Sequence, residues 1–190
     1  MDPVPDRQIF ITGFMATGKS KIGPIVANCL GRSYVDTDDL IQEVAAKTIP
    51  EIFEEDGEAA FRKIEQDCVR KASGMQNSVI ALGGGVVTHE ANWETIRSTG
   101  ICICLCASPE TINRRVARSR ERPLLDGLNE KTRMEKIREL LAEREPFYSR
   151  ADLFVTSTEN RKPEDTAELV VEALMKFAQE TGDRESQNPE

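Results

Sequence analysis

Short apolar runs alternate along the chain with longer stretches in which hydrophobic residues recur every three or four positions. The short runs are typical of buried strands, whereas the periodic stretches place their hydrophobic side chains on one face of a helix. The predicted strands lie within residues 8–12, 34–35, 79–82, 101–106 and 153–155. The predicted helices have apolar faces that contain Leu40, Ile41 and Val44, then Phe61, Ile64 and Cys68, then Ile137, Leu140 and Leu141, and finally Leu169, Val170 and Leu174.

This alternation of strands and helices predicts a three-layer α/β fold with one parallel sheet. Each strand–helix–strand unit forms a right-handed crossover, which leaves helices on both faces of the sheet. Ligands of such sheets bind beyond the carboxyl ends of the strands, where the connecting loops begin. Residues that directly follow a predicted strand are therefore the first candidates for a functional site.

The pattern contains no internal repeat and no linker that would divide the chain, so we expect residues 1–180 to form a single domain. Residues 119–130 are polar and contain proline and glycine, which predicts a mobile loop between two helices. Residues 181–190 carry no apolar anchor, and we expect them to be a frayed, disordered tail.

The composition is that of a globular protein of 190 residues, with 39% hydrophobic and 31% charged residues. A formal net charge of −8 argues against a general nucleic-acid binder, which would carry a basic surface. No apolar run approaches the ~20 residues that span a bilayer, and the acidic, proline-bearing start does not resemble a targeting peptide. We therefore expect a cytoplasmic protein that binds neither nucleic acid nor membrane.

The five cysteines follow no metal-ligand pattern. Cys102, Cys104 and Cys106 alternate in one predicted strand, so they face the same side of it. A zinc site would need further histidine or cysteine ligands, and His89 is the only histidine of the chain. We interpret the alternating cysteines as small buried hydrophobic residues in a reducing compartment.

The strongest chemical motif directly follows the first predicted strand. Residues 13–20 read GFMATGKS and match G-x-x-x-x-G-K-[ST], and a helical pattern covers residues 20–30. Glycines let the backbone turn tightly so that its N–H groups hold phosphate oxygens, and the start of the helix favours anions. Lys19 would contact the β- and γ-phosphates, and the Ser20 hydroxyl would be a Mg²⁺ ligand. A glycine-rich turn without function is the alternative, but the flanking strand and helix favour a nucleotide phosphate site.

Asp36 and Asp38 follow the second predicted strand, at the same sheet edge as the phosphate loop. One carboxylate there can help to hold Mg²⁺, and a second can accept the proton of an attacking hydroxyl. The alternative is that these residues only cap the next helix, a role that suits Asp39 best.

Two further segments indicate an anionic or small ligand. Arg62 and Glu65 stand three positions apart on a predicted helix, where they form either a solvated ion pair or an arginine clamp for a carboxylate. Gly83, Gly84 and Gly85 follow the third strand, where bare N–H groups allow a small ligand to approach closely, or where a plain turn occurs.

Arginines also gather between residues 114 and 122. Phosphoryl transfer spreads negative charge over the transferring group, and an arginine on a closing loop stabilises that charge. Arg122, which precedes a proline on the predicted loop, is the best candidate, whereas some of the other arginines are ordinary solvated charges. Arg144, near the end of a later helix, is a second candidate anion clamp.

Together these motifs resemble the shikimate kinase family. The resemblance covers about residues 8–177 and rests on GFMATGKS, VDTDDLI, IPEIFEEDGEAAFRKIE, VIALGGGVV, RPLL and AEREPFY in that order. Many unrelated NTPases share the phosphate loop, whereas the full set of motifs is far more specific. The resemblance implies a P-loop kinase fold related to nucleoside monophosphate kinases, with a five-stranded parallel sheet of order 2-3-1-4-5 and a mobile lid.

The resemblance also implies phosphoryl transfer from ATP to the 3-hydroxyl of shikimate, on the route to chorismate and aromatic amino acids, by a monomer with Mg²⁺ as cofactor. For catalysis it implies Lys19, Asp38 and Arg122, and for Mg²⁺ it implies Ser20 and Asp36. For ATP it implies Gly13, Ala16, Thr17, Gly18, Lys19, Ser20, Lys21, Arg115, Arg122, Arg161 and Pro163, the last two near adenine. For shikimate it implies Asp38, Arg62, Gly83, Gly84, Gly85 and Arg144, with Glu65 holding Arg62.

Two other functions are compatible with parts of this pattern. A kinase for another polyol acid, such as gluconate, would share the phosphate loop but would not need Arg62 together with the triple glycine. A nucleotide-binding module without transfer activity would bind ATP and turn over no acid, yet no expected catalytic position is missing here.

Overall fold

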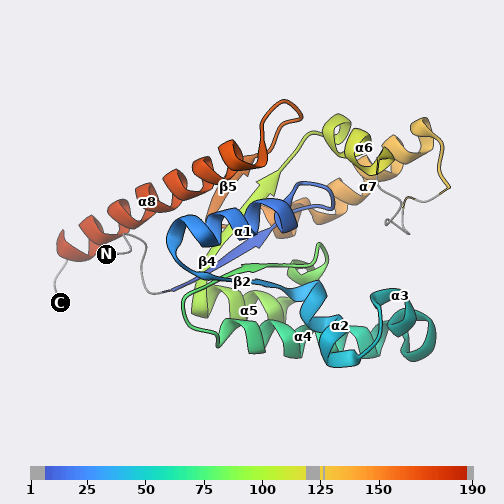
Figure 1. Cartoon of the computed structure of the whole chain (residues 1–190), viewed down its shortest axis with the longest axis horizontal. Helices are drawn as coiled ribbons and strands as arrows, with labels where there is room; N and C mark the ends of the chain where they lie inside the picture. The colour runs from blue at the N-terminus through green and yellow to red at the C-terminus, as the bar shows by residue number, and fades with distance from the viewer. Residues whose placement is uncertain (1–6, 119–124, 126, 188–190) are drawn as a thin grey trace.

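Five parallel strands form one sheet in the order β2-β3-β1-β4-β5 in the computed structural model of the chain, which describes residues 7–118, 125 and 127–187 (Figure 1). The strands are β1 (Gln8–Thr12), β2 (Ser33–Asp36), β3 (Ser78–Ala81), β4 (Gly100–Cys106) and β5 (Leu153–Thr156). The predicted fold class and strand order are therefore confirmed, and each predicted strand is found within two residues of its expected bounds.

The central strands are mostly apolar because both faces of the sheet are covered, and their polar residues Gln8, Thr12 and Ser78 lie at strand ends. Every residue of β1 and β3 is buried, and Phe10 of β1 pairs with Ile80 of β3 on one side and Cys102 of β4 on the other. The edge strands β2 and β5 are partly exposed. This difference in burial explains why the central strands were the clearest apolar runs in the sequence.

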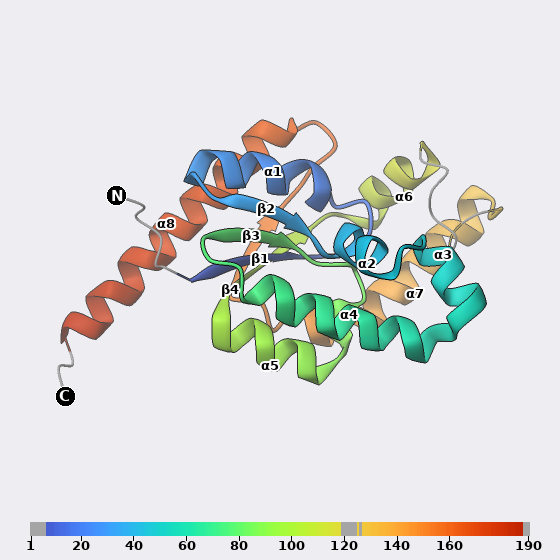
Figure 2. The ribbon, with the colours of Figure 1, turned by 60° about the horizontal axis from the view of Figure 1, so that its bottom comes forward.

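Helices pack on both faces of the sheet (Figure 2). One face is covered by α1 (Lys19–Leu30) and α8 (Pro163–Gln187), whose apolar side chains share a core cluster with β1 and β4. The other face is covered by α4 (Gly57–Ser73) and α5 (Glu90–Thr99), around the fully buried Trp93. None of the described helices is long and apolar enough to cross a membrane.

The remaining helices lie beyond the carboxyl ends of the strands (Figure 1). On one side of this end are α2 (Thr37–Ala45), α3 (Ile49–Glu51) and the π-helical turn Ile52–Asp56. On the other side are α6 (Pro109–Ala117) and α7 (Glu130–Tyr148), while a short 3₁₀ turn, Val86–Thr88, follows the triple glycine. The predicted ligand-binding end of the sheet is thus bordered by two separate groups of helices.

Two segments were expected to depart from regular structure. The predicted loop does connect two helices, since α6 ends at Ala117 and α7 begins at Glu130, and Leu125 within it is buried in the core. Residues 119–124 and 126 lie outside the described residues. Toward the C-terminus, α8 continues through the expected tail to Gln187, because no proline interrupts the helix before Pro189. Residues 188–190 are outside the described part of the chain.

Candidate active site

The phosphate loop joins the end of β1 to the start of α1, as its motif predicted. Gly13 and Gly18 have φ angles of 139° and 107°, a region that residues with a Cβ rarely adopt. A Cβ at Gly13 would also collide with the carbonyl of Leu105. Lys19 Nζ donates to the carbonyl oxygens of Gly13 and Phe14, at 2.8 and 3.2 Å, so its ammonium group lies over the loop.

The first turn of α1 is suited to an anion. No described side chain caps this helix, and its first turn contains no acidic residue. The N–H groups at the start of a helix carry a partial positive charge, which stabilises phosphate oxygens placed there. The N–H groups of the loop and of the helix start, together with Lys19, therefore surround the same space.

Asp36 connects β2 to the phosphate loop. Its Oδ2 atom accepts hydrogen bonds from Ser20 Oγ at 3.0 Å and from the Tyr34 hydroxyl at 3.1 Å. Its Oδ1 atom accepts from the backbone N–H of Asp38 at 3.0 Å, which makes Asp36 the N-cap of α2. The capping interpretation is therefore confirmed for Asp36, whose role as a Mg²⁺ ligand stays a prediction. The expectation that Asp39 caps the helix is wrong, because Asp39 lies within its first turn.

The three consecutive glycines each face a different predicted acceptor-binding side chain. A Cβ at Gly83 would collide with Asp38 Oδ1, and Cβ atoms at the next two glycines would lie 3.2 Å from Nη1 of Arg144 and of Arg62 respectively. The backbone of residues 83–85 therefore lies against the carboxylate and both guanidinium groups. A plain turn would not require this absence of side chains.

Arg62 is held in place by carboxylates of its own helix. Its Nη1 lies 3.1 Å from both carboxylate oxygens of Glu65, and its Nη2 lies 3.2 Å from Glu58 Oε1. The Glu65 side chain is only 3% exposed, so the pair is not a solvated one. Burial raises the pKa of Glu65, while the charge of Arg62 and its hydrogen bonds oppose that rise. An arginine positioned in this way is prepared to bind a carboxylate.

Arg144 reaches the same place from α7. Its Nη1 donates to the carbonyl oxygen of Gly84 at 3.3 Å, and its guanidinium group lies 5.4 Å from the centre of the Phe14 ring. The Tyr148 hydroxyl, one turn later, donates to the same carbonyl at 3.0 Å. Sequence reasoning assigned no role to Phe14 or Tyr148, although both lie inside motifs that the resemblance used.

Arg115, on α6, connects the phosphate loop to the segment that precedes α8. This side chain donates from Nη1 to the carbonyl oxygens of Ala16 and Thr17, at 3.0 and 3.2 Å, and from Nη2 to Ser157 Oγ at 3.0 Å. Arg161 donates to the carbonyl of Thr156 at 2.8 Å. Arg115 thereby ties the phosphate loop to the segment in which adenine contacts were expected.

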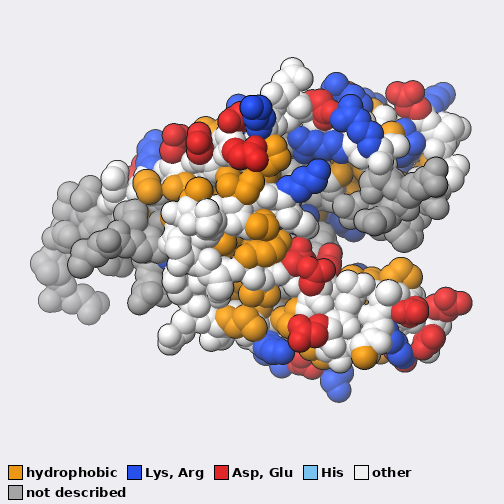
Figure 3. Space-filling view, in the orientation of Figure 1, with side chains coloured by type: hydrophobic (Ala, Val, Ile, Leu, Met, Phe, Trp, Pro, Cys, Tyr) orange, Lys and Arg blue, Asp and Glu red, His pale blue; other side chains and the backbone are white. Residues whose placement is uncertain are grey.

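A single cleft of about 560 Å³ brings most of these residues together. Its lining includes the predicted residues Ala16, Gly18, Lys19, Ser20, Lys21, Asp36, Asp38, Gly84, Arg115, Arg161 and Pro163. The space-filling view is hollowed on this side, between the basic surface over α6 and the surface over α2 and α3 (Figure 3). Arg122 lies outside the described residues, so the structure does not place it.

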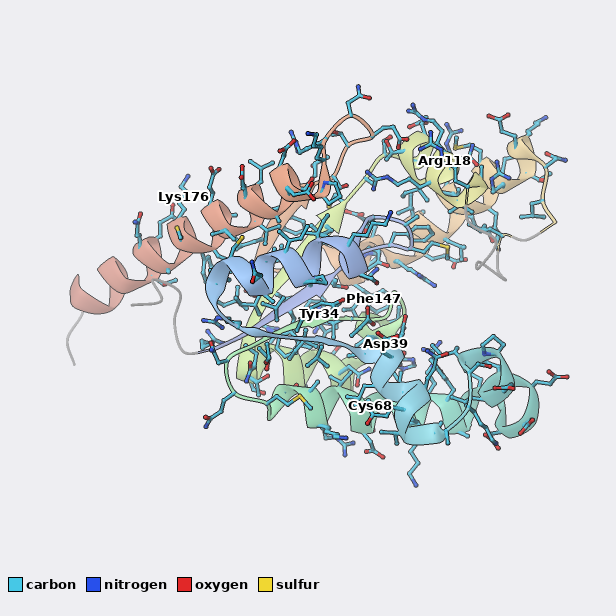
Figure 4. The ribbon with its side chains drawn as sticks, in the orientation of Figure 1. Tyr34, Asp39, Cys68, Arg118, Phe147 and Lys176 are labelled. Atoms are coloured by element: carbon cyan, nitrogen blue, oxygen red, sulfur yellow. The ribbon has the colours of Figure 1, made fainter. Side chains whose placement is uncertain are left out.

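Seven lining residues of the cleft were not predicted as site residues: Met15, Ile22, Leu82, Arg118, Ser157, Glu159 and Thr166. Arg118 on α6 donates to Glu159 Oε1 at 2.7 Å, and Ser157 accepts from Arg115. Arg118 and the labelled Asp39 lie on opposite sides of the opening (Figure 4). The clustering of arginines after residue 114 was the available signal for Arg118, whereas Ser157 and Glu159 carried none.

A parallel sheet with a phosphate loop after its first strand, a hydroxyl–carboxylate pair beside that loop and arginines at the cleft define a P-loop kinase. The family model for shikimate kinase matches residues 15–175. A curated shikimate kinase of Caldanaerobacter subterraneus subsp. tengcongensis is 44% identical over 90% of this chain and 98% of its own length. That of Thermoanaerobacter pseudethanolicus is 42% identical, with the same coverage of both chains. The chain belongs to the shikimate kinase family, whose members are ATP-dependent phosphotransferases.

Solved structures agree with this assignment. The shikimate kinase of Bacteroides thetaiotaomicron superposes with a TM-score of 0.83 at 32% identity and covers 88% of this chain and 98% of its own. The shikimate kinase of Acinetobacter baumannii, in complex with shikimate, gives 0.83 at 30% identity, over 91% and 95% of the two chains. A gluconokinase of Sinorhizobium meliloti is 11% identical with a TM-score of 0.59, a likeness of fold alone.

Proposed function

We propose that this protein transfers the γ-phosphoryl group of ATP to the 3-hydroxyl of shikimate, giving ADP and shikimate 3-phosphate on the route to chorismate and the aromatic amino acids. Membership of the family supports this reaction. The single observation that carries it for this chain is the triple glycine, whose residues separately face Asp38, Arg144 and Arg62 beside the phosphate loop.

The acceptor half of the proposed site suits a small hydroxylated carboxylic acid. Arg62 and Arg144 present planar guanidinium groups, which bind a carboxylate through paired hydrogen bonds. Asp38 accepts a hydrogen bond from the attacking hydroxyl and orients it or takes its proton. Gly83, Gly84 and Gly85 carry no side chain, so a compact acid fits against their backbone between these three groups.

The donor half holds the triphosphate. The β- and γ-phosphates are bound by Lys19, by the loop N–H groups and by the start of α1. This proposal is supported by the position of the Lys19 ammonium group over the loop and by the start of α1, which no described side chain caps. The loop residues proposed to take part are Gly13, Ala16, Thr17, Gly18, Ser20 and Lys21, and those proposed near the base are Arg115, Arg161 and Pro163. Arg122 is proposed to stabilise the charge on the transferring phosphoryl group.

The residues beside the phosphate loop fit a Mg²⁺ ion. Ser20 Oγ and Asp36 Oδ2 are hard oxygen ligands that lie 3.0 Å apart. Within the described ranges, no group of three or more histidine, cysteine or acidic side chains could hold a metal ion. Mg²⁺ in such sites also uses water and phosphate oxygens as ligands. Bound Mg²⁺ neutralises negative charge on the β- and γ-phosphate oxygens. Ser20 and Asp36 are the residues proposed to hold it.

The proposed enzyme works as a monomer in the cytoplasm. The lining of the cleft and the residues around the triple glycine come from one chain, which supports a site that needs no second copy. The reaction consumes ATP, which the cytoplasm supplies.

The test is a coupled assay of ADP release with MgATP and either shikimate or gluconate. We expect turnover with shikimate and a rate near the acid-free background with gluconate. Turnover with gluconate alone would replace this proposal by the polyol-acid alternative. ATP binding by calorimetry without turnover of either acid would instead indicate a binding module.

A further inference from the structure

A second cavity, of about 340 Å³, lies behind the phosphate loop. It shares no lining residue with the ATP cleft among the residues that the structure describes. The loop, β4 and α7 contribute most of its wall, including Phe14, Thr17, Cys104, Cys106, Leu141 and Tyr148. A volume of this size accepts a small molecule, and aliphatic and aromatic side chains of this kind favour an apolar one.

The cavity contains two thiols that contact each other. Cys104 and Cys106 point to the same side of β4, and their Sγ atoms lie 3.8 Å apart. Both are free thiols. Residues two apart on an extended strand have Cα atoms about 6.6 Å apart, near the upper end of the range for a disulfide, so the pair is not predisposed to bond to itself. Cys104 is buried, whereas Cys106 is partly exposed toward the cavity.

This contact makes the two thiols chemically unequal. In the neutral pair the Cys106 thiol donates to Cys104 Sγ at 3.8 Å. Once Cys106 is ionised, Cys104 donates to its thiolate, and this lowers the pKa of Cys106 to about 7, against the opposing effects of burial and of the Glu145 charge. The same hydrogen bond, with burial, raises the pKa of Cys104. Other ionisable groups near the pair are Cys102 on the same strand, Tyr148 on α7 and Lys19 at the start of α1. Cys106 is thus the thiol that supplies a thiolate near neutral pH.

We propose that Cys106 is a modification site for small, apolar, soft electrophiles that enter this cavity, such as α,β-unsaturated carbonyl compounds, and that its modification slows the kinase. The Cys106 thiol first releases its proton to solvent. The thiolate then adds to the β-carbon, so a C–S bond forms while the C=C π bond breaks. The resulting enolate takes a proton from water and leaves a thioether.

The effect on the kinase rests on the proposed function and follows from the cavity wall. Phe14 forms part of that wall, and its ring also lies against the Arg144 guanidinium group. Thr17 donates from its hydroxyl to the carbonyl of Phe14 at 2.8 Å, inside the phosphate loop. An adduct on Cys106 therefore presses on Phe14, which supports both the phosphate loop and Arg144.

The test uses a Cys29→Ser protein, because Cys29 on α1 is the other accessible thiol among the described residues. The protein is treated with N-ethylmaleimide and followed by intact mass, peptide mapping and shikimate-dependent ADP release. We expect one adduct, on Cys106, and activity that falls in proportion to it. The matched Cys29→Ser/Cys106→Ser protein should stay unmodified and active under the same treatment. Full activity after complete modification of Cys106 would overturn the regulatory part of the proposal.

The labelling rate tests the site independently of kinase activity. At pH 7, Cys104→Ala should slow the modification of Cys106 about tenfold, because the Cys106 pKa returns toward about 8.5 without its partner, and the rates should converge near pH 9. Cys104→Val serves if the alanine variant does not fold. Equal rates at pH 7, or a Cys106 that reacts only after denaturation, would refute the site itself. Protein that is labelled as expected but never phosphorylates shikimate would refute only the proposed function.

Discussion

Three aspartates at the end of β2 have different surroundings. Asp36 caps α2 and accepts hydrogen bonds from Ser20 and Tyr34, so its carboxylate faces the phosphate loop. Asp38, two positions later, lies against Gly83 on the acceptor side. Asp39 is exposed in the first turn of the helix. The three aspartates are close in the sequence, but α2 begins at Thr37, between Asp36 and Asp38. Their side chains therefore point in different directions.

Asp38→Asn should lower turnover by a factor of about 10²–10⁴, because an amide cannot take the proton of the attacking hydroxyl. ATP affinity should change little, since the carboxylate is proposed to act on the acceptor. Steady-state kinetics with shikimate and calorimetry with ATP measure the two effects. The matched control is Asp39→Asn, which should keep turnover within about twofold. Equal rates for the two variants would remove Asp38 from the mechanism.

Tyr34 is a positioning residue for the proposed Mg²⁺ ligand. Burial and the neighbouring Asp36 raise the pKa of the Tyr34 hydroxyl, so it stays protonated and donates to that carboxylate. Its ring lies directly on Gly23, where a Cβ would collide with it. The ring position is therefore set by packing and does not depend on the hydroxyl group.

Tyr34→Phe should raise the Mg²⁺ concentration needed for half-maximal rate about tenfold. The substitution removes one hydrogen bond that orients Asp36 but retains the aromatic ring. The KM for shikimate should stay as in the wild type, because the acceptor side chains are untouched. Initial rates as a function of free Mg²⁺ provide the measurement. An unchanged Mg²⁺ dependence would show that the hydroxyl does not position the carboxylate.

At the scale of elements, the turn after β3 determines how the acceptor side chains meet. Arg62 comes from α4 and Arg144 from α7, and both reach the backbone of residues 83–85. Each of these helices contributes one guanidinium group to the turn. The sheet order, which places β3 next to β1, brings this turn beside the phosphate loop.

Gly84→Ala should raise the KM for shikimate about tenfold while the fold is retained. The added Cβ would lie 3.2 Å from Arg144 Nη1, the end of a flexible side chain, so Arg144 can move aside but loses its position. The control is Gly74→Ala at the end of α4, where φ is −83° and the nearest atom to a Cβ would be 3.5 Å away. If the two variants had the same KM, close approach at Gly84 would not matter for binding.

At the scale of the whole molecule, the cleft is lined by segments that are distant in the sequence, and no one of them forms the site alone. Arg115 links the phosphate loop to Ser157, which directly follows β5, and Asp36 links the loop to β2. A ligand that contacts all of these segments binds only the folded chain. Such a ligand must therefore stabilise the fold by mass action.

MgATP at a hundred times its Kd should raise the melting temperature by about 5–10 °C, which corresponds to ~2.7 kcal/mol for a domain of this size. Lys19→Met should lose most of this shift, because Lys19 is proposed to contact the phosphates. Lys176→Met on α8 is the control, since this lysine is 78% exposed and lies far from the cleft (Figure 4). Thermal melts with and without MgATP give the comparison. A full shift in the Lys19 variant would contradict the assignment of the phosphate site.

Much of the architecture was predictable because its signals are local. The apolar runs marked the central strands, since β1 and β3 are buried on both faces and are therefore mostly apolar. The bounds of the partly exposed β2 and the cap at Asp36 were less certain, because an exposed edge strand and three nearby aspartates allow several local solutions. The role of Tyr148 was hidden, because its partner carbonyl lies 64 positions away.

The sequence by itself determined the phosphate loop, the order of the motifs and the family, because short spacings of glycine, lysine and serine encode that chemistry directly. Only the tertiary structure decided which groups share a pocket. It placed Arg62 and Arg144 against neighbouring glycines of one turn, and it placed Cys104 and Cys106 in the wall of a separate cavity behind the loop. The physical reason is that such contacts depend on strand order and side-chain packing, which join residues that are distant along the chain.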